Sequence, residues 1–217
     1  AAAMVLAMGS ATGVASAQGV MGDKTASEII AAERANVEGL SAPAKVEMPS
    51  LMPGDEAPAL KVATYVKGTP VSEFEKGTAY MVDFWATWCG PCIAAMPHMT
   101  DLQDKYEDDN FRLIGVSIWE RQEDDELIDH VTSWVEKNDE EMGYTVAIDD
   151  DGQMAESWMV ASGQRGIPTA MIVDREGRVA WIGYGNEAQL DTALEEVING
   201  TWDIDAAREA RKATMKE

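Results

Sequence analysis

The chain has 217 residues, of which 46% are hydrophobic and 26% are charged, a composition typical of a globular protein with one main core. Its 39 acidic residues outnumber its 17 basic residues, which gives a formal net charge of -22 at pH 7. Nucleic acids and anionic membrane surfaces attract Lys and Arg, so this excess of acid argues against both as partners.

The chain begins with an uncharged segment, residues 1–17, which reads AAAMVLAMGSATGVASA. Its apolar content and its small-x-small ending are typical of a secretory signal peptide that lacks its start. We therefore expect cleavage near Ala17 and a soluble mature protein exported to a compartment such as the bacterial periplasm. Such a compartment is oxidising and lets a cysteine pair cycle. Gln18 follows the expected cut, which disfavours a lipid anchor at that position.

Residues 18–53 are expected to hold one helix and a proline-rich linker. Apolar residues recur at roughly helical spacing over 18–40, and we expect this apolar stripe to dock on the parent domain rather than on a partner. The stretch 41–58 contains four prolines in SAPAKVEMPSLMPGDEAP and predicts an extended arm. The globular domain is expected over 54–202, followed by a charged tail or helix at 203–217.

Strands and helices alternate through the expected domain. Strands are predicted at 60–66, 78–86, 111–118, 144–148, 169–173 and 178–182. Helices are predicted at 90–107, 124–137, 153–159 and 187–199. The first helix should be interrupted and kinked at Pro97, whose ring removes a backbone hydrogen bond. This order predicts an α/β protein with a central mixed β-sheet flanked by helices on both faces.

The chain has two cysteines, Cys89 and Cys92, and both lie where the strand 78–86 meets the next helix. A helix N-terminus carries partial positive charge and favours a thiolate, so Cys89 is the expected nucleophile, exposed and with a lowered pKa. Cys92 lies one turn inside the helix and is expected to be the shielded, resolving thiol. Three-apart cysteines can close a small disulfide ring, which predicts a redox-active disulfide.

Other uses of a cysteine pair fit the sequence less well. A structural disulfide of this spacing would constrain the unfolded chain little. Zinc needs four ligands, whereas the chain adds only His98 and His130, so we expect neither a metal nor another cofactor. A thiol peroxidase is an alternative, although the Pro and Thr expected just upstream of its nucleophile are missing before Cys89. A non-catalytic binding module that uses the acidic surface and the N-terminal helix is the other alternative.

Asp83 is an acid inside a strand that otherwise reads as buried. An unpaired carboxylate is costly to bury, so burial should raise its pKa toward neutrality. Such a group suits a general acid or base for a nearby buried thiol. The alternative is a side chain that faces a wet cavity and makes only a structural hydrogen bond.

Two motifs resemble known proteins. The run VDFWATWCGPC at 82–92 resembles thioredoxin, and GIPT at 166–169 with the strand after it resembles the cis-proline segment of the same superfamily. The distance between the motifs, the region 138–164 and the closing GRVAWIGYG resemble the exported TlpA/ResA-like thiol-disulfide oxidoreductases. The resemblance covers about residues 54–202 and implies a thioredoxin-like fold.

The resemblance also implies roles for individual residues. Cys89 would attack a substrate disulfide, Cys92 would resolve the mixed disulfide, and Pro168 would be the cis-proline that faces them. Asp83 matches the buried aspartate that takes the proton from the resolving thiol. Residues that would contact the protein substrate are Trp88, Gly90, Pro91, Ile167 and Pro168, with Ile167 offering its backbone to an extended segment.

The sequence departs from the TlpA/ResA-like pattern at two positions. Members usually carry an uncharged polar residue at the strand position and a glutamate three residues after the second cysteine; here these are Asp83 and Ala95. This departure argues against the cytochrome-maturation role linked to that glutamate. We expect an enzyme that reduces disulfides of exported proteins and is itself re-reduced by a membrane electron-donor thiol protein. The Gly-Pro pair between the cysteines is that of thioredoxin and favours this reducing direction.

Overall fold

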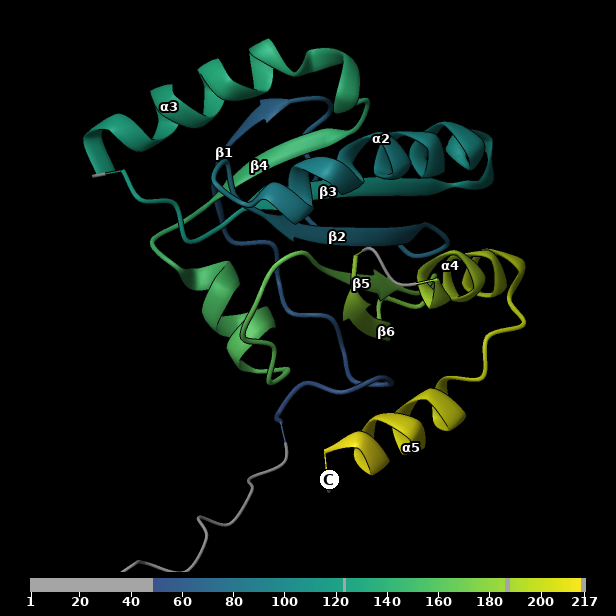
Figure 1. Cartoon of the computed structure of the whole chain (residues 1–217). Coiled ribbons are helices and arrows are strands. Elements are labelled where there is room, and N and C mark those ends of the chain that lie inside the picture. The colour runs from purple at the N-terminus through teal and green to yellow at the C-terminus, as the bar shows by residue number, and fades with distance from the viewer. Residues whose placement is uncertain (1–48, 123, 186–187, 216–217) are drawn as a thin grey trace, which may run out of the picture. The chain divides into compact units, whose positions relative to one another are not determined.

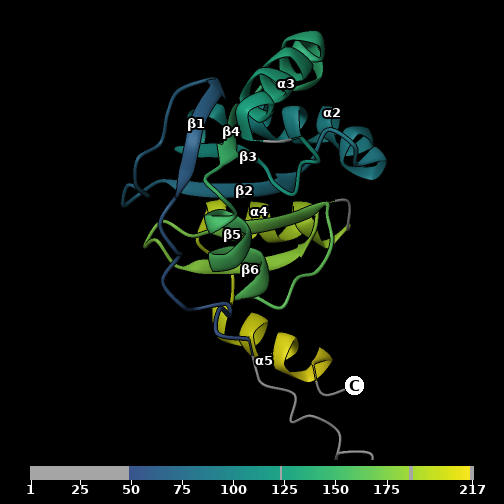
Figure 2. The same cartoon turned by 90° about the vertical axis from the view of Figure 1, so that its left-hand side faces the viewer.

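The computed structural model describes residues 49–215 except 123 and 186–187. The predicted signal peptide and N-terminal helix lie outside these residues. Within them, six strands form one sheet in the order β1-β4-β3-β2-β5-β6 (Figures 1 and 2). The strands are Val62–Lys67 (β1), Ala79–Trp85 (β2), Phe111–Ser117 (β3), Thr145–Asp149 (β4), Thr169–Val173 (β5) and Val179–Tyr184 (β6).

The sheet is mixed, as the sequence predicts. β2 runs parallel to β3, and β3 runs parallel to β4. β5 and β6 form an antiparallel hairpin beside β2, and β1 pairs antiparallel with β4. Every residue of β2 is buried, which fits a central strand covered on both faces and explains its almost continuous apolar sequence.

Helices cover both faces of the sheet. The helices are Gly90–Lys105 (α2), Asp124–Lys137 (α3), Gln189–Asn199 (α4) and Ile204–Thr214 (α5), and a π-helical segment spans Ala155–Val160. Buried side chains of α2, α3 and α4 pack with one face of the sheet. The π-helical segment packs on the other face together with Leu51 and Val71. The predicted α/β, thioredoxin-like architecture is confirmed.

The proline in the first helix does not end it. α2 continues across Pro97 to Lys105, so the predicted break is wrong, while the predicted kink stays a prediction. The proline ring removes one backbone donor, but Met96 and Met99 on either side are fully buried in the core. Tertiary packing therefore holds the two halves of α2 in one helix.

The end of the proline-rich arm packs along the sheet. Leu51 and Met52 are buried. The Gly54 N–H donates to the Val179 carbonyl at 2.7 Å, and the Val179 N–H donates to the Asp55 carbonyl at 2.9 Å. This segment thus covers the beginning of the edge strand β6, whose backbone groups would otherwise be open to pairing with another chain. No helix among the described residues is long and apolar enough to cross a membrane.

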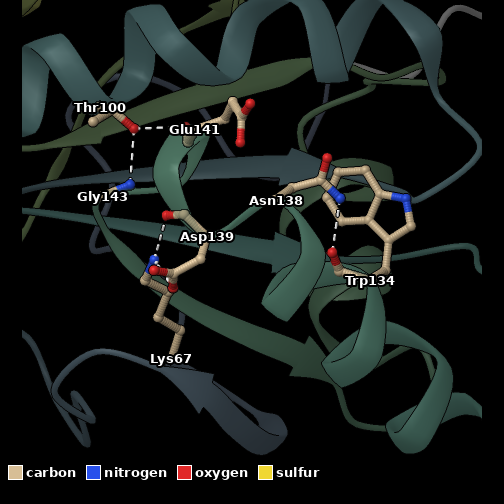
Figure 3. A network of polar contacts seen from close by, with 7 residues as sticks. All are labelled: Lys67, Thr100, Trp134, Asn138, Asp139, Glu141 and Gly143. Atoms are coloured by element: carbon tan, nitrogen blue, oxygen red, sulfur yellow. Dashed lines mark hydrogen bonds and ion pairs between the residues drawn. The ribbon is translucent and has the colours of Figure 1, made fainter.

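A polar network ties the segment before β4 to α2 (Figure 3). The Thr100 hydroxyl on α2 donates to the Glu141 carbonyl at 2.7 Å and accepts from the Gly143 N–H at 2.9 Å. On the other side of this segment, Lys67 Nζ donates to the Asp139 carbonyl at 2.7 Å and pairs with the Asp139 carboxylate. The chain that leads into β4 is therefore fixed between β1 and α2.

Gly115 lies on β3, where two aromatic side chains pack closely against the backbone. It lies opposite Asp83 in the parallel pairing of β2 with β3. A Cβ at this position would lie 2.8 Å from Tyr144 Cε2 and 3.2 Å from Trp85 Nε1. The absence of a side chain at 115 therefore lets the Tyr144 ring and the Trp85 indole nitrogen approach the strand closely.

Candidate functional site

The two cysteines form a disulfide at the start of α2. Cys89 is the residue that caps the helix N-terminus, and its Sγ accepts a hydrogen bond from the Cys92 N–H at 3.3 Å. Pro91 lies in the first turn, where a missing backbone donor costs nothing. The loop after β2 closes on itself before the helix, since the Cys89 N–H donates to the Ala86 carbonyl at 3.0 Å.

The electrostatics of this helix end favour a thiolate on Cys89. Its first turn holds no acidic side chain, although the chain carries a net charge of -22. The unsatisfied N–H groups and the helix dipole therefore act on the sulfur without a nearby carboxylate in the helix to oppose them. Within the described residues, no group of three or more His, Cys, Asp or Glu side chains is placed to hold a metal ion.

The sequence predicts an exposed Cys89 and a shielded Cys92, but the structure buries both. Cys89 is 4% exposed and Cys92 is 3% exposed. Both cysteines belong to the buried cluster that α2 forms with the sheet.

An aromatic surface lies beside the disulfide. Trp88 is 41% exposed and Trp119, in the loop after β3, is 39% exposed. The Trp88 indole N–H donates to the Trp119 carbonyl at 2.9 Å, and the Arg121 guanidinium lies 4.6 Å from the Trp88 ring centre. Trp85, by contrast, is fully buried in the core. Exposed indole rings next to a reactive sulfur form a surface on which a protein substrate can pack.

The second sequence motif begins β5. The peptide bond between Ile167 and Pro168 is cis. Pro168 is buried, and the Gly185 N–H reaches its carbonyl at 3.4 Å. Ile167 is partly buried and packs against the core cluster that contains both cysteines. The role of its backbone in substrate binding stays a prediction.

Asp83 is buried on the face of the sheet that α2 covers. Its side chain is 4% exposed, and among the described residues its Oδ1 has no hydrogen-bond partner. Gly185 passes close by: a Cβ there would lie 3.2 Å from Asp83 Oδ1 and 3.5 Å from Pro168 Cβ. Burial raises the pKa of Asp83 from 3.8 to about 7, since the charged form loses its hydration. The expected burial and raised pKa are thus confirmed.

Glu120 is a polar residue of this region that no local sequence motif indicates. Its carboxylate accepts from the Thr87 N–H at 2.8 Å, the Thr87 hydroxyl at 2.7 Å and the Ser117 hydroxyl at 2.6 Å. It thereby fixes the loop that carries Trp88 and leads into Cys89. The place of Glu120 could be expected from the parallel pairing of β2 with β3. Parallel strands end at the same edge of the sheet, so the residues that follow β2 and β3 lie close together.

The two histidines lie in different surroundings. His130, to which the sequence assigns no role, is half-buried on α3, and its Nε2 lies 3.1 Å from the Thr87 hydroxyl oxygen. The Thr87 hydroxyl donates to Glu120, so it can accept from the His130 ring N–H. His98 lies on the exposed side of α2, where its Nε2 is 2.8 Å from the Asp191 carboxylate.

The chain is similar to a known protein family and to individual proteins of known name. The chain matches the model of the AhpC/TSA family over residues 53–182. It is 31% identical over 154 residues to "Protein FixW" of Rhizobium leguminosarum, covering 70% of this chain and 69% of that protein. It is also 31% identical over 147 residues to "Thiol-disulfide oxidoreductase ResA" of Bacillus cereus, covering 66% of this chain and 78% of that protein.

A solved structure agrees with these matches. The crystal structure of a putative thiol:disulfide interchange protein DsbE from Chlorobium tepidum superposes with a TM-score of 0.51 at 27% identity. The match covers 71% of this chain and 100% of that chain. The family match extends from before β1 into β6 and therefore includes both cysteines, Asp83 and Pro168.

Replacing the buried acid should stabilise the fold in a pH-dependent way. The pKa of Asp83 is about 7 in the folded protein and 3.8 as an ordinary aspartate. The folded state therefore holds the proton more tightly, and it loses stability as the pH rises from about 4 to about 7. Asp83→Asn should raise the free energy of unfolding by about 2–4 kcal/mol at pH 8.5 and change it little at pH 3.5.

Urea denaturation at both pH values measures this difference. Asp101→Asn, at an exposed position of α2, is the matched control and should leave the free energy of unfolding unchanged at both pH values. Equal stability of wild type and Asp83→Asn at pH 8.5 would contradict the buried, costly carboxylate.

Removing the Glu120 carboxylate should destabilise the loop before Cys89. Glu120→Ala leaves three donors without their acceptor. The free energy of unfolding should fall by about 1–3 kcal/mol, and fluorescence of the exposed Trp88 should change. The control Glu126→Ala, at an exposed position of α3, should lower the free energy of unfolding by less than about 0.5 kcal/mol. A stability loss no larger for Glu120→Ala than for Glu126→Ala would refute the role of Glu120 in holding this loop.

Proposed function

The chain belongs to the AhpC/TSA family and within it to the ResA/TlpA-like thiol-disulfide oxidoreductases, and from this premise we propose that it reduces disulfides of exported proteins. The observation that carries the proposal is the disulfide at the N-terminus of α2 with a buried acid on the sheet face beneath that helix. A helix N-terminus activates one sulfur, and the acid can accept the proton of the other.

The reduced enzyme attacks first. The Cys89 thiolate forms a bond with one sulfur of the substrate disulfide, and the other substrate sulfur leaves as a thiolate. The product is a mixed disulfide between Cys89 and the substrate. Trp88 with Trp119 on one side, and Ile167 with Pro168 on the other, are the residues proposed to hold the substrate segment during this step. At this stage Cys89 Sγ is oxidised and one substrate sulfur is reduced, while Cys92 is still a thiol.

The second step needs a proton acceptor. The Cys92 thiol gives its proton to the Asp83 carboxylate, and the resulting thiolate attacks Cys89 Sγ. The Cys89–Cys92 bond forms, and the substrate leaves with its second sulfur reduced. Two electrons have passed from the enzyme dithiol to the substrate disulfide. A carboxyl group with a pKa near 7 can both take this proton and release it to solvent near neutral pH.

We propose a setting outside the cytoplasm for this reaction. The uncharged N-terminal segment that ends near Ala17 supports export, and an exported enzyme needs a thiol donor across the membrane to regenerate its dithiol. The Gly-Pro pair between the cysteines supports the reducing direction. Ala95 stands where ResA/TlpA-like members usually carry a glutamate, so we propose general disulfide reduction rather than cytochrome maturation.

The test of the proposed reaction is trapping of partners through Cys89. Cys92→Ser cannot resolve the mixed disulfide, so exported proteins should accumulate as covalent complexes that dithiothreitol releases. Cys89→Ser, the matched control, should trap none. Failure of Cys92→Ser to trap any partner would refute disulfide reduction. Rapid peroxide consumption that persists in Cys92→Ser would support a thiol peroxidase instead.

A second experiment tests the proton acceptor. Asp83→Asn keeps the size of the side chain but cannot take up the Cys92 proton, so release of a preformed mixed disulfide at pH 7 should slow about 100-fold. The initial attack by Cys89 should keep its rate. Stopped-flow tryptophan fluorescence separates the two steps, and release that is as fast as in the wild type across pH 6 to 9 would exclude Asp83 as the acceptor.

A further inference from the structure

A cavity lies between α5 and β6, the last strand of the sheet (Figure 1). Its volume is about 440 Å³, which falls within the range of small-molecule sites. Neither cysteine nor Asp83 lines it, so it is separate from the redox site. Large apolar and aromatic side chains form much of its wall: Trp181, Ile182, Tyr184 and Trp202.

The charge of this wall is opposite to that of the whole chain. Among the described residues, the charged side chain that lines the cavity is Arg211 of α5. No Asp or Glu of the described residues lines it, although the chain has 39 acidic residues against 17 basic ones. Neutral side chains such as Gln164, Gln189 and Thr214 supply further polar groups. An apolar cavity with this one positive charge is complementary to an anion that has an apolar body.

Arg211 is held by neutral groups and not by an acid. Its Nη2 donates to the Ser162 carbonyl at 2.6 Å, and its Nη1 donates to the Ile182 carbonyl at 3.3 Å. Its Nε is buried without a hydrogen-bond partner, and no acid among the described residues forms an ion pair with it. Burial lowers the pKa of Arg211 below its usual range, since the guanidinium has lost part of its hydration. This cation therefore lacks the counter-charge that buried charges usually have.

Other contacts attach α5 to the domain. The Trp202 indole N–H, just before the helix, donates to the Ala180 carbonyl of β6 at 3.0 Å. Arg208 of α5 forms an ion pair with Asp55 at 2.7 Å. A neutral amide at position 211 could donate to the same carbonyls as the guanidinium, so these bonds do not require the positive charge of Arg211.

We propose that the cavity between β6 and α5 binds a small aromatic carboxylate, whose anionic group pairs with Arg211. The carboxylate accepts hydrogen bonds from guanidinium N–H groups that the two backbone carbonyls do not use, and such charge-assisted bonds are strong. The aromatic body of the ligand packs against Trp181, Tyr184 and Trp202. This binding site is independent of the reaction proposed for the disulfide.

The first test compares an anionic probe with its neutral analogue. Diphenylacetate and diphenylacetamide are titrated into the oxidised full chain at neutral pH, and binding is measured by calorimetry. Diphenylacetate should bind saturably, and the amide should bind about tenfold more weakly or less, because the anion alone gains a charged partner. The absence of saturable binding of diphenylacetate, or equal affinities for the two probes, would overturn the inference.

The second test removes the charge of Arg211. Arg211→Gln should weaken the binding of diphenylacetate about tenfold and leave that of the amide unchanged, whereas Arg211→Lys should keep part of the preference for the anion. Lys212→Gln is the matched control, because it makes the same change in net charge at the next residue, which pairs with Glu209. It should leave both affinities unchanged. Equal affinity of Arg211→Gln and wild type for diphenylacetate would contradict the proposed site.

A third variant fills the cavity and keeps the test decisive if Arg211→Gln does not fold. Ala207 of α5 lines the cavity, so the phenyl ring of Ala207→Phe should occupy the space and abolish the binding of both probes. Ala213→Phe, at an exposed position of the same helix that does not line the cavity, is its control and should bind both probes like the wild type. Undiminished binding of diphenylacetate by Ala207→Phe would place the probe outside this cavity and refute the inference.

Discussion

The parallel pairing of β2 with β3 is the constraint on which the site depends. The two strands pair in register from Ala79 with Phe111 to Trp85 with Ser117, so both end at the same edge of the sheet. The loop after β2 leads into Cys89, and the loop after β3 carries Trp119 and Glu120. Parallel strands place these loops side by side, and Glu120 then joins them through hydrogen bonds to Thr87. The disulfide is thus held by two segments far apart in the sequence.

The same pairing places the buried acid. Asp83 lies two residues before the end of β2, directly opposite Gly115 of β3. A larger residue than glycine at 115 would displace the Tyr144 ring, which α2 holds in place through Thr100 and Gly143. Gly185, directly after β6, passes close to Asp83 Oδ1, so the environment of the carboxylate depends on β2, β3 and the segment after β6 together. This shared dependence explains how a costly buried charge can be kept at one defined position beneath the redox pair.

Much of the fold follows from local sequence patterns. The apolar runs of β2 and β3 and the amphipathic pattern of α3 predict these elements to within a residue or two. A strand buried on both faces is apolar throughout, and a helix buried on one face repeats its apolar residues with the helical period. The predicted break of the helix at Pro97 does not occur. The prediction considered the lost hydrogen bond but not the packing of Met96 and Met99 in the core. The packing of the end of the proline-rich arm is also not predicted, because this segment pairs with residues of β6 that lie more than 100 positions away in the sequence.

The sequence by itself determined where the redox pair and the buried acid lie: two cysteines three apart at a helix entrance can close a disulfide, and an acid within an apolar strand is buried with a raised pKa. Only the tertiary structure decided what surrounds them. Glu120 and His130 carry no local signal of a role, because they come near the site through strand pairing and helix packing. Hydrogen-bond partners from distant segments depend on register and depth in the core, which no short stretch of sequence specifies.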